Sequence, residues 1–247
     1  MPHTDAQLSL TTTIGLLNEH PLHASLKHWY ARPGDRLEAA LGGYIVDILR
    51  GDQIIEIQTG NFAAIRRKMR TLSRDYRVTL VYPVAHERWI LTLPTMTHDH
   101  PVRRKSPKRQ RLDQLFRELV SFPDLLQDPH FAIEVAVIQD EEVRCFDRRA
   151  RRRRRGWSVT ERRLLGVLAR HVVATPTDLW SLIPMGLPEP FQTSHLARVL
   201  GRPRWFAQKA AYCLRESGAS TAIGKAGNAI VYSRPPASTL LHVPLSV

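Results

Sequence analysis

The chain has 247 residues, enough for one large or two small domains, and its apolar content of 43% is ordinary for a globular protein. Lysine and arginine outnumber aspartate and glutamate by 36 to 23, and the formal charge of +13 favours a polyanionic partner, nucleic acid before an anionic membrane surface. The two cysteines, Cys145 and Cys213, predict neither a disulfide framework nor a zinc site, which fits a cytoplasmic protein, and no apolar stretch is long enough to predict a membrane span.

The first predicted elements are helical. Residues 1–20 are polar and rich in threonine, and they predict a loose lead-in. A short helix is predicted over Leu22–Tyr30. Asp35, with Glu38 three residues later, has the spacing of a capping box and predicts a second helix over Arg36–Leu41.

A tight β-hairpin is predicted next. Gly51-Asp52 has the pattern of a two-residue hairpin loop between two apolar strands. Counting back from this loop places Asp47 directly opposite Glu56, where Cβ atoms lie roughly 5 Å apart and like charges repel. A divalent cation shared by both carboxylates would remove that repulsion, and hard cations such as magnesium prefer carboxylate oxygen.

The rest of the first half predicts a mixed sheet. A helix is predicted over Phe62–Tyr76, followed by strands at Val78–Tyr82, ended by Pro83, and at Trp89–Leu93. This order favours a small mixed sheet covered by helices. Further along, the sequence predicts a basic loop at 98–111, a helix at Leu112–Val120 and a buried strand at Phe131–Ile138.

Seven arginines occupy the eight positions from Arg148 to Arg155. A block of like charge tends to be extended, so we predict a linker and a domain boundary over 146–156. Two readings are compatible with this run: a solvated linker, or a salt-sensitive phosphate clamp for DNA or RNA. The predicted clamp consists of Arg151, Arg152, Arg153, Arg154 and Arg155.

The last third has the pattern of a winged helix-turn-helix over residues 157–236, followed by a tail at 237–247. Ser158 and Glu161 have capping-box spacing and predict a helix to about Val173. A short helix is predicted at Asp178–Leu182, and two helices, Ser194–Leu200 and Arg204–Glu216, flank the turn Gly201-Arg202-Pro203. A hairpin with a loop at 224–228 follows.

The first half resembles the PD-(D/E)xK nuclease superfamily over roughly residues 35–83. The resemblance implies an αβββαβ core, which predicts a restriction-endonuclease-like α/β domain over 21–145. It also implies that Asp47 and Glu56 bind magnesium or manganese, with the Ile57 carbonyl as a third ligand. Glu38 matches the extra acid that some members carry on the preceding helix. Gln58 stands where the motif has lysine, which removes a positive charge from the expected site but keeps a group able to orient water.

Two other interpretations of the acidic pair remain open. Asp47 could be a core carboxylate bonded to Arg66, Arg67 or Arg70. The pair could also persist in a fold that no longer cuts, so that the protein is a non-catalytic DNA-binding regulator whose nuclease-like domain recognises structure or forms a homodimer.

The second helix of the predicted turn supplies the expected DNA contacts. Phe206 falls on its inward stripe, and we expect Trp205 to be buried as well. Arginine and glutamine can bond base edges, and lysine contacts phosphates. The expected nucleic-acid-binding residues are Arg204, Gln208, Lys209, Tyr212 and Arg215, with Lys225 at the wing tip. The sequence therefore favours a double-stranded-DNA-binding protein with a metal-dependent nuclease-like domain that hydrolyses phosphodiester bonds. The non-catalytic regulator is the alternative, and use of the winged helix for protein contacts is a third option.

Overall fold

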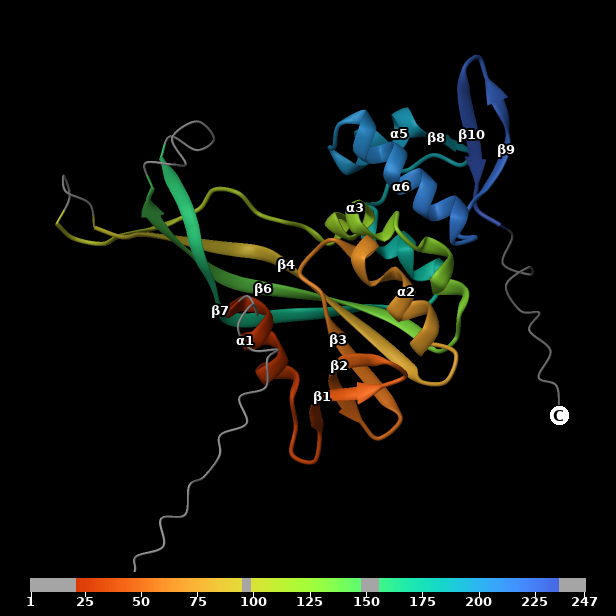
Figure 1. Cartoon of the computed structure of the whole chain (residues 1–247). Helices are drawn as coiled ribbons and strands as arrows, with labels where there is room; N and C mark the ends of the chain where they lie inside the picture. Colours follow the sequence, from red (N-terminus) through yellow and green to blue (C-terminus); the bar gives the residue numbers. More distant parts are fainter. Residues whose placement is uncertain (1–20, 95–98, 148–155, 236–247) are drawn as a thin grey trace, which may run out of the picture.

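The computed structural model describes residues 21–94, 99–147 and 156–235 of the chain (Figure 1). These residues form a mixed α/β structure around a seven-stranded sheet, with strand order β1-β2-β3-β4-β6-β7 and with β5 paired to β4. The strands of this sheet are β1 (Arg36–Leu41), β2 (Tyr44–Arg50), β3 (Gln53–Ile57), β4 (Arg77–Thr92), β5 (Val102–Lys105), β6 (Phe131–Phe146) and β7 (Trp157–Val173). The helices are α1 (Pro21–Tyr30), α2 (Phe62–Leu72), α3 (Leu115–Leu119), α5 (Thr193–Leu200) and α6 (Arg204–Glu216), with 3-10 turns η2 (Leu112–Gln114), η3 (Pro123–Gln127) and η5 (Pro176–Leu182).

The two faces of the sheet are covered by different helices (Figure 1). Helix α1 packs its apolar residues on one face, in a cluster that includes Ile55 and Ile57 of β3. Helices α2, α3, α5 and α6 belong to the larger cluster on the other face, which includes Ile54. Successive side chains of a strand point to opposite faces, so Glu56, between Ile55 and Ile57, belongs to the α2 face.

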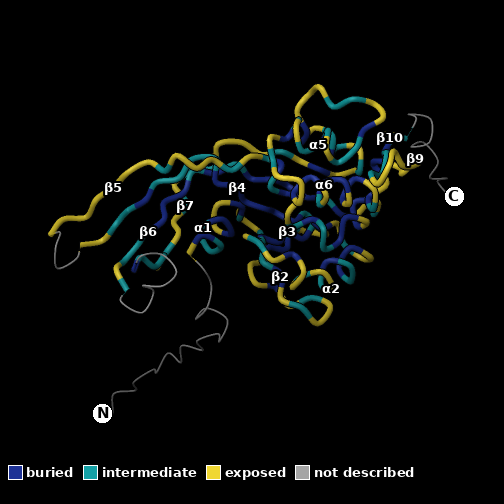
Figure 2. The backbone as a smooth tube through the Cα atoms, turned by 90° about the horizontal axis from the view of Figure 1, so that it is seen from above, coloured by how far each residue is buried: buried dark blue, intermediate teal, exposed yellow. Residues whose placement is uncertain are grey.

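Three long strands extend beyond the helices. Strands β4, β6 and β7 have 16, 16 and 17 residues, and with β5 they form an arm on one side of the molecule (Figures 1 and 2). Figure 2 shows buried residues, in dark blue, under the helices, and mostly exposed or half-buried residues toward the end of this arm.

The predicted helix over Arg36–Leu41 is wrong, because these residues form strand β1 paired antiparallel with β2. Asp35 does not cap a helix. Its carboxylate accepts two hydrogen bonds from Arg50, at 2.9 and 2.8 Å, and one from the Arg32 backbone N–H. The ion pair of Asp35 with Arg50 and the backbone pairing of β1 with β2 stabilise the strand more than a helix cap would stabilise a helix here.

Strand β4 contains both predicted strands except Leu93, and Pro83 does not end it. Val78 donates its backbone N–H to His130, on the β6 side, so the odd-numbered residues of β4 present their backbone groups to the β3 side. β3 pairs β4 only as far as Val81. The missing N–H of Pro83 therefore faces a side with no paired strand, where it costs no ladder bond. The predicted helix over Phe62–Tyr76 is confirmed as α2, four residues shorter at its end.

The predicted helix from Ser158 to Val173 is also wrong. These residues belong to β7, which pairs antiparallel with β6 from Phe146–Trp157 to Ile133–Val173. The predicted boundary at 146–156 therefore lies within one sheet, between two paired strands, rather than between domains. The arginines at 148–155 lie outside the described residues.

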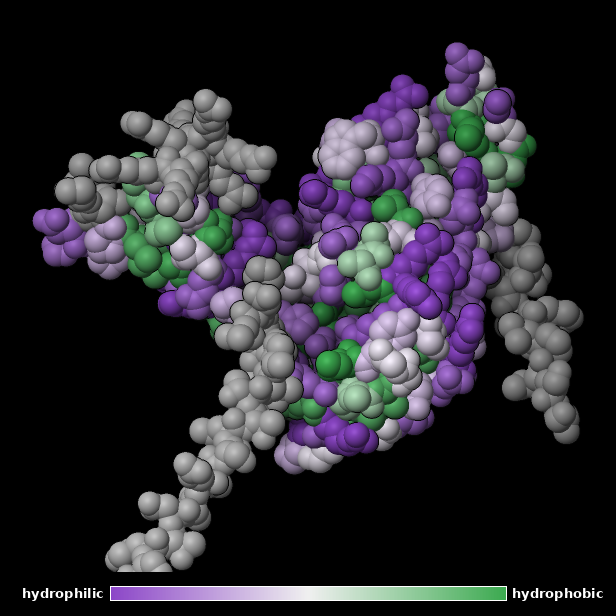
Figure 3. All heavy atoms as spheres, viewed as in Figure 1, coloured by the Kyte–Doolittle hydropathy of each residue, from purple (hydrophilic) through white to green (hydrophobic). Residues whose placement is uncertain are grey.

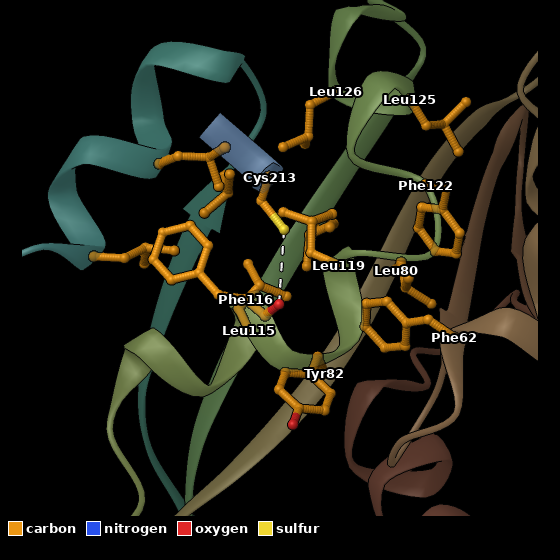
Figure 4. Packing of buried hydrophobic residues seen from close by; sticks show 14 of the residues in the cluster. Phe62, Leu80, Tyr82, Leu115, Phe116, Leu119, Phe122, Leu125, Leu126 and Cys213 are labelled. Carbon is orange, nitrogen blue, oxygen red and sulfur yellow. Dashed lines mark hydrogen bonds between the residues drawn. The ribbon is translucent and has the colours of Figure 1, made fainter. Parts of the chain in front are cut away.

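The C-terminal elements largely follow the prediction. Helices α5 and α6 flank a turn in which Gly201 adopts φ 60°, and β9 (Thr221–Ala226) pairs with β10 (Ala229–Ser233) around a shorter turn than expected. A short strand, β8 (Phe191–Gln192), adds to β10 and makes a three-stranded sheet. These elements share a buried core with the main sheet: Cys213 of α6 lies among the leucines of α3, with its thiol 3.7 Å from the Phe116 carbonyl oxygen (Figure 4). Burial raises the pKa of this thiol, which suits a core side chain.

Candidate functional site

The hairpin register places Asp47 beside Glu56 as expected. Strands β2 and β3 pair through Ile48–Ile55, Leu49–Ile54 and Arg50–Gln53, and one further step along this register reaches Asp47 and Glu56. The Asp47 backbone N–H donates to Glu56 Oε2 at 3.3 Å. The two acids are therefore neighbours at the end of the β2–β3 pair.

Glu56 is paired with a lysine of α2. Its side chain is 6% exposed, and Oε1 accepts a short hydrogen bond from Lys68 Nζ. The same ammonium donates to the Ile45 backbone carbonyl at 2.7 Å. Burial raises the pKa of Glu56, and the nearby negative charge of Asp47 raises it further; Lys68 offsets part of this rise.

Asp47 is bonded from the other helix. His23 of α1 places Nε2 3.2 Å from Asp47 Oδ2, and the Ile57 backbone N–H donates to the same oxygen at 2.8 Å. Burial by itself would raise the pKa of Asp47. The hydrogen bond and charge of His23, with the Ile57 N–H and Lys68, nevertheless hold the pKa of this carboxyl below its usual value.

The expected shared magnesium site does not fit this arrangement. Each carboxylate is engaged by a basic side chain, Glu56 by Lys68 on α2 and Asp47 by His23 on α1, and these helices cover opposite faces of the sheet. Across residues 21–94, 99–147 and 156–235, no three histidine, cysteine, aspartate or glutamate side chains lie in an arrangement that could hold a metal ion. The expected third ligand was the Ile57 carbonyl oxygen; the contact that this residue makes with the pair is through its backbone N–H, which donates to Asp47.

The other two expected catalytic residues bond to other partners, although Glu38 lies across from Asp47 in the β1–β2 register, between the pairs Leu37–Ile48 and Ala39–Val46. Gln58 Nε2 donates to the backbone carbonyl of Gly60, two residues along the same loop. Glu38 is on strand β1 rather than on a preceding helix, in a backbone with φ 49°, and its Oε1 accepts a hydrogen bond from Lys27 Nζ at 2.7 Å. Neither residue contacts Asp47 or Glu56 through a hydrogen bond among the described residues.

The sequence did not identify His23 and Lys68. The expected cationic partner of Asp47 was Arg66, Arg67 or Arg70 of α2, but Asp47 is engaged by His23 of α1, and the cation that α2 supplies, Lys68, pairs with Glu56 instead. Arg66 and Arg67 are exposed, and Arg70 pairs with Asp124 at 2.6 Å. Helical periodicity could have found Lys68, because it lies three positions after Ile65 and four before Leu72, both of which pack on the sheet-facing side of α2.

The expected DNA-contacting residues share the outer side of α6 and the hairpin beyond it. Arg204, Gln208 and Arg215 are exposed, and Tyr212 is 42% exposed. Arg215 is bonded to Glu216, which reduces its availability. Lys209 is half-buried, and Lys225 is exposed on β9. The predicted clamp, Arg151 to Arg155, lies outside the described residues.

Trp205 differs from expectation. It is 53% exposed, whereas Phe206 is buried at 3%. The ammonium of Lys209 lies 6.0 Å from the Trp205 ring centroid. The outer side of α6 therefore combines cationic, amide and aromatic groups.

A family model described as "Domain of unknown function (DUF8091)" matches residues 20–174. This range ends one residue after β7 and contains the whole seven-stranded sheet. An uncharacterized protein of Treponema pallidum (strain Nichols) is 30% identical over 225 residues, which cover 91% of this chain and 88% of that protein. No solved structure matches. Among the helices of the described ranges, none combines the length and apolar character needed to cross a bilayer.

Proposed function

The chain belongs to the DUF8091 family, and from the geometry of its residues we propose that it is a double-stranded-DNA-binding protein. The observation that carries this proposal is the outer side of α6. Arg204, Gln208 and Tyr212 are exposed there on one helix, in a chain with a formal charge of +13. Arginine and glutamine are side chains that read base edges, and the overall charge favours association with a polyanion.

The order of the C-terminal elements supports a winged helix-turn-helix arrangement. Strand β8, helices α5 and α6 and the hairpin β9–β10 follow one another, and β8 pairs with β10 at the base of the hairpin. Buried Leu196, Leu200 and Phe206 hold α5 against α6. In such domains the second helix enters the major groove, and the hairpin lies beside it along the backbone.

The main test concerns Arg204 and Gln208. We expect Arg204→Ala or Gln208→Ala to weaken binding to a preferred duplex by about 1–3 kcal/mol per lost base contact and to relax sequence preference. Binding would be measured on a randomised duplex pool and then on the selected sequence.

Arg66→Ala is the matched control, because it removes the same charge from an exposed position on α2. It should change affinity little and leave sequence preference intact. Unchanged preference in both α6 variants would refute base reading by this helix.

The order of the N-terminal elements supports a nuclease-like fold, and the contacts of the two acids argue against a metal site in it. The order α1-β1-β2-β3-α2-β4 is the αβββαβ order that the PD-(D/E)xK resemblance implies. His23 and Lys68 engage the two acids from opposite sides of the sheet. We therefore favour the non-catalytic form of the proposal, in which this domain is a structural or recognition element.

Metal-dependent cleavage is the second candidate, and one observation favours it. Lys68 places an ammonium group against Glu56. This charge could replace that of the motif's lysine, whose position is occupied here by the uncharged Gln58. The protein would be incubated with plasmid and linear DNA in magnesium, manganese or EDTA, beside Asp47→Asn and the exposed-acid control Asp52→Asn.

The non-catalytic form predicts no metal-dependent cutting by any of these proteins. Cutting that requires magnesium or manganese, and that Asp47→Asn abolishes while Asp52→Asn retains, would establish the nuclease instead.

A further inference from the structure

A basic groove lies between the arm and the C-terminal elements (Figure 3). One wall is made by β4, β6 and β7, and the other by α3 and the turn between α5 and α6; the segment 106–110 passes along it. Its volume is about 800 Å³. Figure 3 shows the arm and the C-terminal elements standing apart, with hydrophilic residues between them.

Several of the groove's arginines are neutralised within the protein. Arg88 donates to Asp140 at 2.8 and 2.6 Å and lies 3.3 Å from Glu142. Arg144 also bonds Glu142, at 2.6 Å. Arg202 makes two bonds to the buried carboxylate of Asp113. These ion pairs hold the walls of the groove in place, and the carboxylates neutralise most of the positive charge of these arginines.

Apart from the arginines around Glu142, which include Arg162 at 3.6 Å, and from Arg202, three cations of the groove remain available. Lys108 and Arg109 are exposed and form no salt bridge within the described residues. Arg117 is exposed on α3, and its nearest acid, Glu118, is 3.8 Å away, beyond hydrogen-bonding distance. Glu142 is the one acid among the lining residues, and the bonds described above engage it. The unsatisfied charge of the groove is therefore positive.

An aromatic ring lies at the arm side of this groove. Trp157, the first residue of β7, is half-buried and packs edge-on against Phe146 at 5.6 Å between centroids. An aromatic face beside a positively charged groove is the combination that single-stranded nucleic acids use, because bases stack on the ring while cations follow the backbone.

We propose that this groove binds a single-stranded segment of DNA through Lys108, Arg109 and Arg117, with Trp157 as a stacking platform. About 800 Å³ is within the range of sites that enclose molecules of drug size, roughly 300–1,000 Å³, so it holds a few nucleotides of one strand and excludes a duplex. The inference rests on the proposed function and deepens it: the substrate is a duplex with a single-stranded extension, the duplex on α6 and the extension in the groove.

The test compares a blunt duplex with the same duplex carrying a single-stranded tail. The wild-type chain should bind the tailed duplex roughly tenfold more tightly, and log affinity should fall more steeply with log salt concentration, by ~0.7 for each phosphate contacted on the tail. In the variant Lys108→Ala/Arg109→Ala/Arg117→Ala this gain and the extra salt slope should disappear, while affinity for the blunt duplex stays near that of the wild type.

Two further variants make the result specific. Arg66→Ala/Arg67→Ala/Arg74→Ala removes three exposed charges outside the groove and should keep the gain from the tail. Trp157→Ala should reduce this gain without changing the salt slope, because it removes a stacking surface and no charge. A cooperative thermal unfolding transition would show that each variant is folded.

The outcomes separate the two proposals. Binding to blunt duplex with no gain from a tail, or a gain that survives in the groove variant, overturns the groove alone. A wild-type chain that binds neither DNA overturns the proposed function and the groove with it. Loss of blunt-duplex affinity in Arg204→Ala, with the gain from the tail retained, supports both.

Discussion

Replacing Asp113 by alanine should destabilise the junction between the main sheet and the C-terminal elements. The loss should exceed that from replacing an acid of any exposed or half-exposed ion pair. The Asp113 side chain is 1% exposed and accepts hydrogen bonds from Arg202 at 2.8 and 2.7 Å and from Arg111 at 2.6 Å. Arg111 also donates to the Leu200 carbonyl at 2.6 Å, so one carboxylate organises both the end of α5 and the turn before α6. The hydrogen bond to Asp113 raises the pKa of Arg202.

Asp113→Ala would leave the two guanidiniums without their shared acceptor. Breaking a buried ion pair costs about 3–5 kcal/mol, and we expect about 3 kcal/mol here because both arginines retain contact with water. The free energy of unfolding would be measured in urea, and hydrogen exchange would show whether α5 and α6 lose protection first.

The control for this prediction is Asp124→Ala. Asp124 pairs with Arg70 in a similar geometry, but the two side chains are 46% and 36% exposed. An exposed pair contributes about 0–1 kcal/mol. Equal losses in the two variants would contradict a special role for the buried carboxylate.

Replacing Lys68 by methionine should have the second large effect, at the acidic pair. Lys68 is 15% exposed and Glu56 is 6% exposed, and methionine keeps the length of the side chain without its charge. Burial and the charge of Asp47 already raise the pKa of Glu56, so removing the lysine should raise it further. We expect a loss of about 3–5 kcal/mol at neutral pH, the cost of leaving one buried charge unpaired.

The loss should depend on pH in a known direction. A carboxyl whose pKa is higher in the folded state binds more protons when folded, so stability falls as pH rises from the unfolded pKa to the folded one. Lys68→Met should therefore be least damaging at acidic pH, and its loss should grow toward neutral pH. Asp47 acts in the opposite direction, because its lowered pKa gives stability that is lost as pH falls through the folded value.

Adding Glu56→Gln to Lys68→Met tests the cause. The amide cannot ionise, so the double variant should recover much of the lost stability at neutral pH and lose the pH dependence. Lys105→Met removes a lysine whose pair with Glu87 is 43% and 28% exposed, and it should cost under about 1 kcal/mol. A pH-independent loss in Lys68→Met would mean that packing, rather than charge, accounts for the effect.

Local patterns were sufficient for part of the fold. The hairpin register that brings Asp47 to Glu56 follows from a two-residue loop and alternation alone, and both are short-range features. Helices α5 and α6 were also predicted at nearly their observed limits, because a glycine, a proline and helical periodicity mark their ends within a few residues.

Long-range pairing explains the errors. Ser158–Val173 has a capping-box spacing, yet it forms β7, because the whole segment finds partners on β6 along its length. Arg36–Leu41 becomes a strand for the same reason, through pairing with β2. A capping box is worth about 1 kcal/mol, whereas a continuous ladder and the burial that comes with it contribute over many residues.

By itself, the sequence determined the basic character of the chain, the meeting of two acids across a tight turn and the exposed cationic side of α6, because each depends on composition or on neighbours a few residues apart. The tertiary structure decided which side chains neutralise those acids, that the arginine-rich segment connects two strands of one sheet, and that cations from distant segments border one groove. These depend on elements up to about a hundred residues apart, such as Arg202 with Asp113, that are brought together by the packing of one shared core on the sheet.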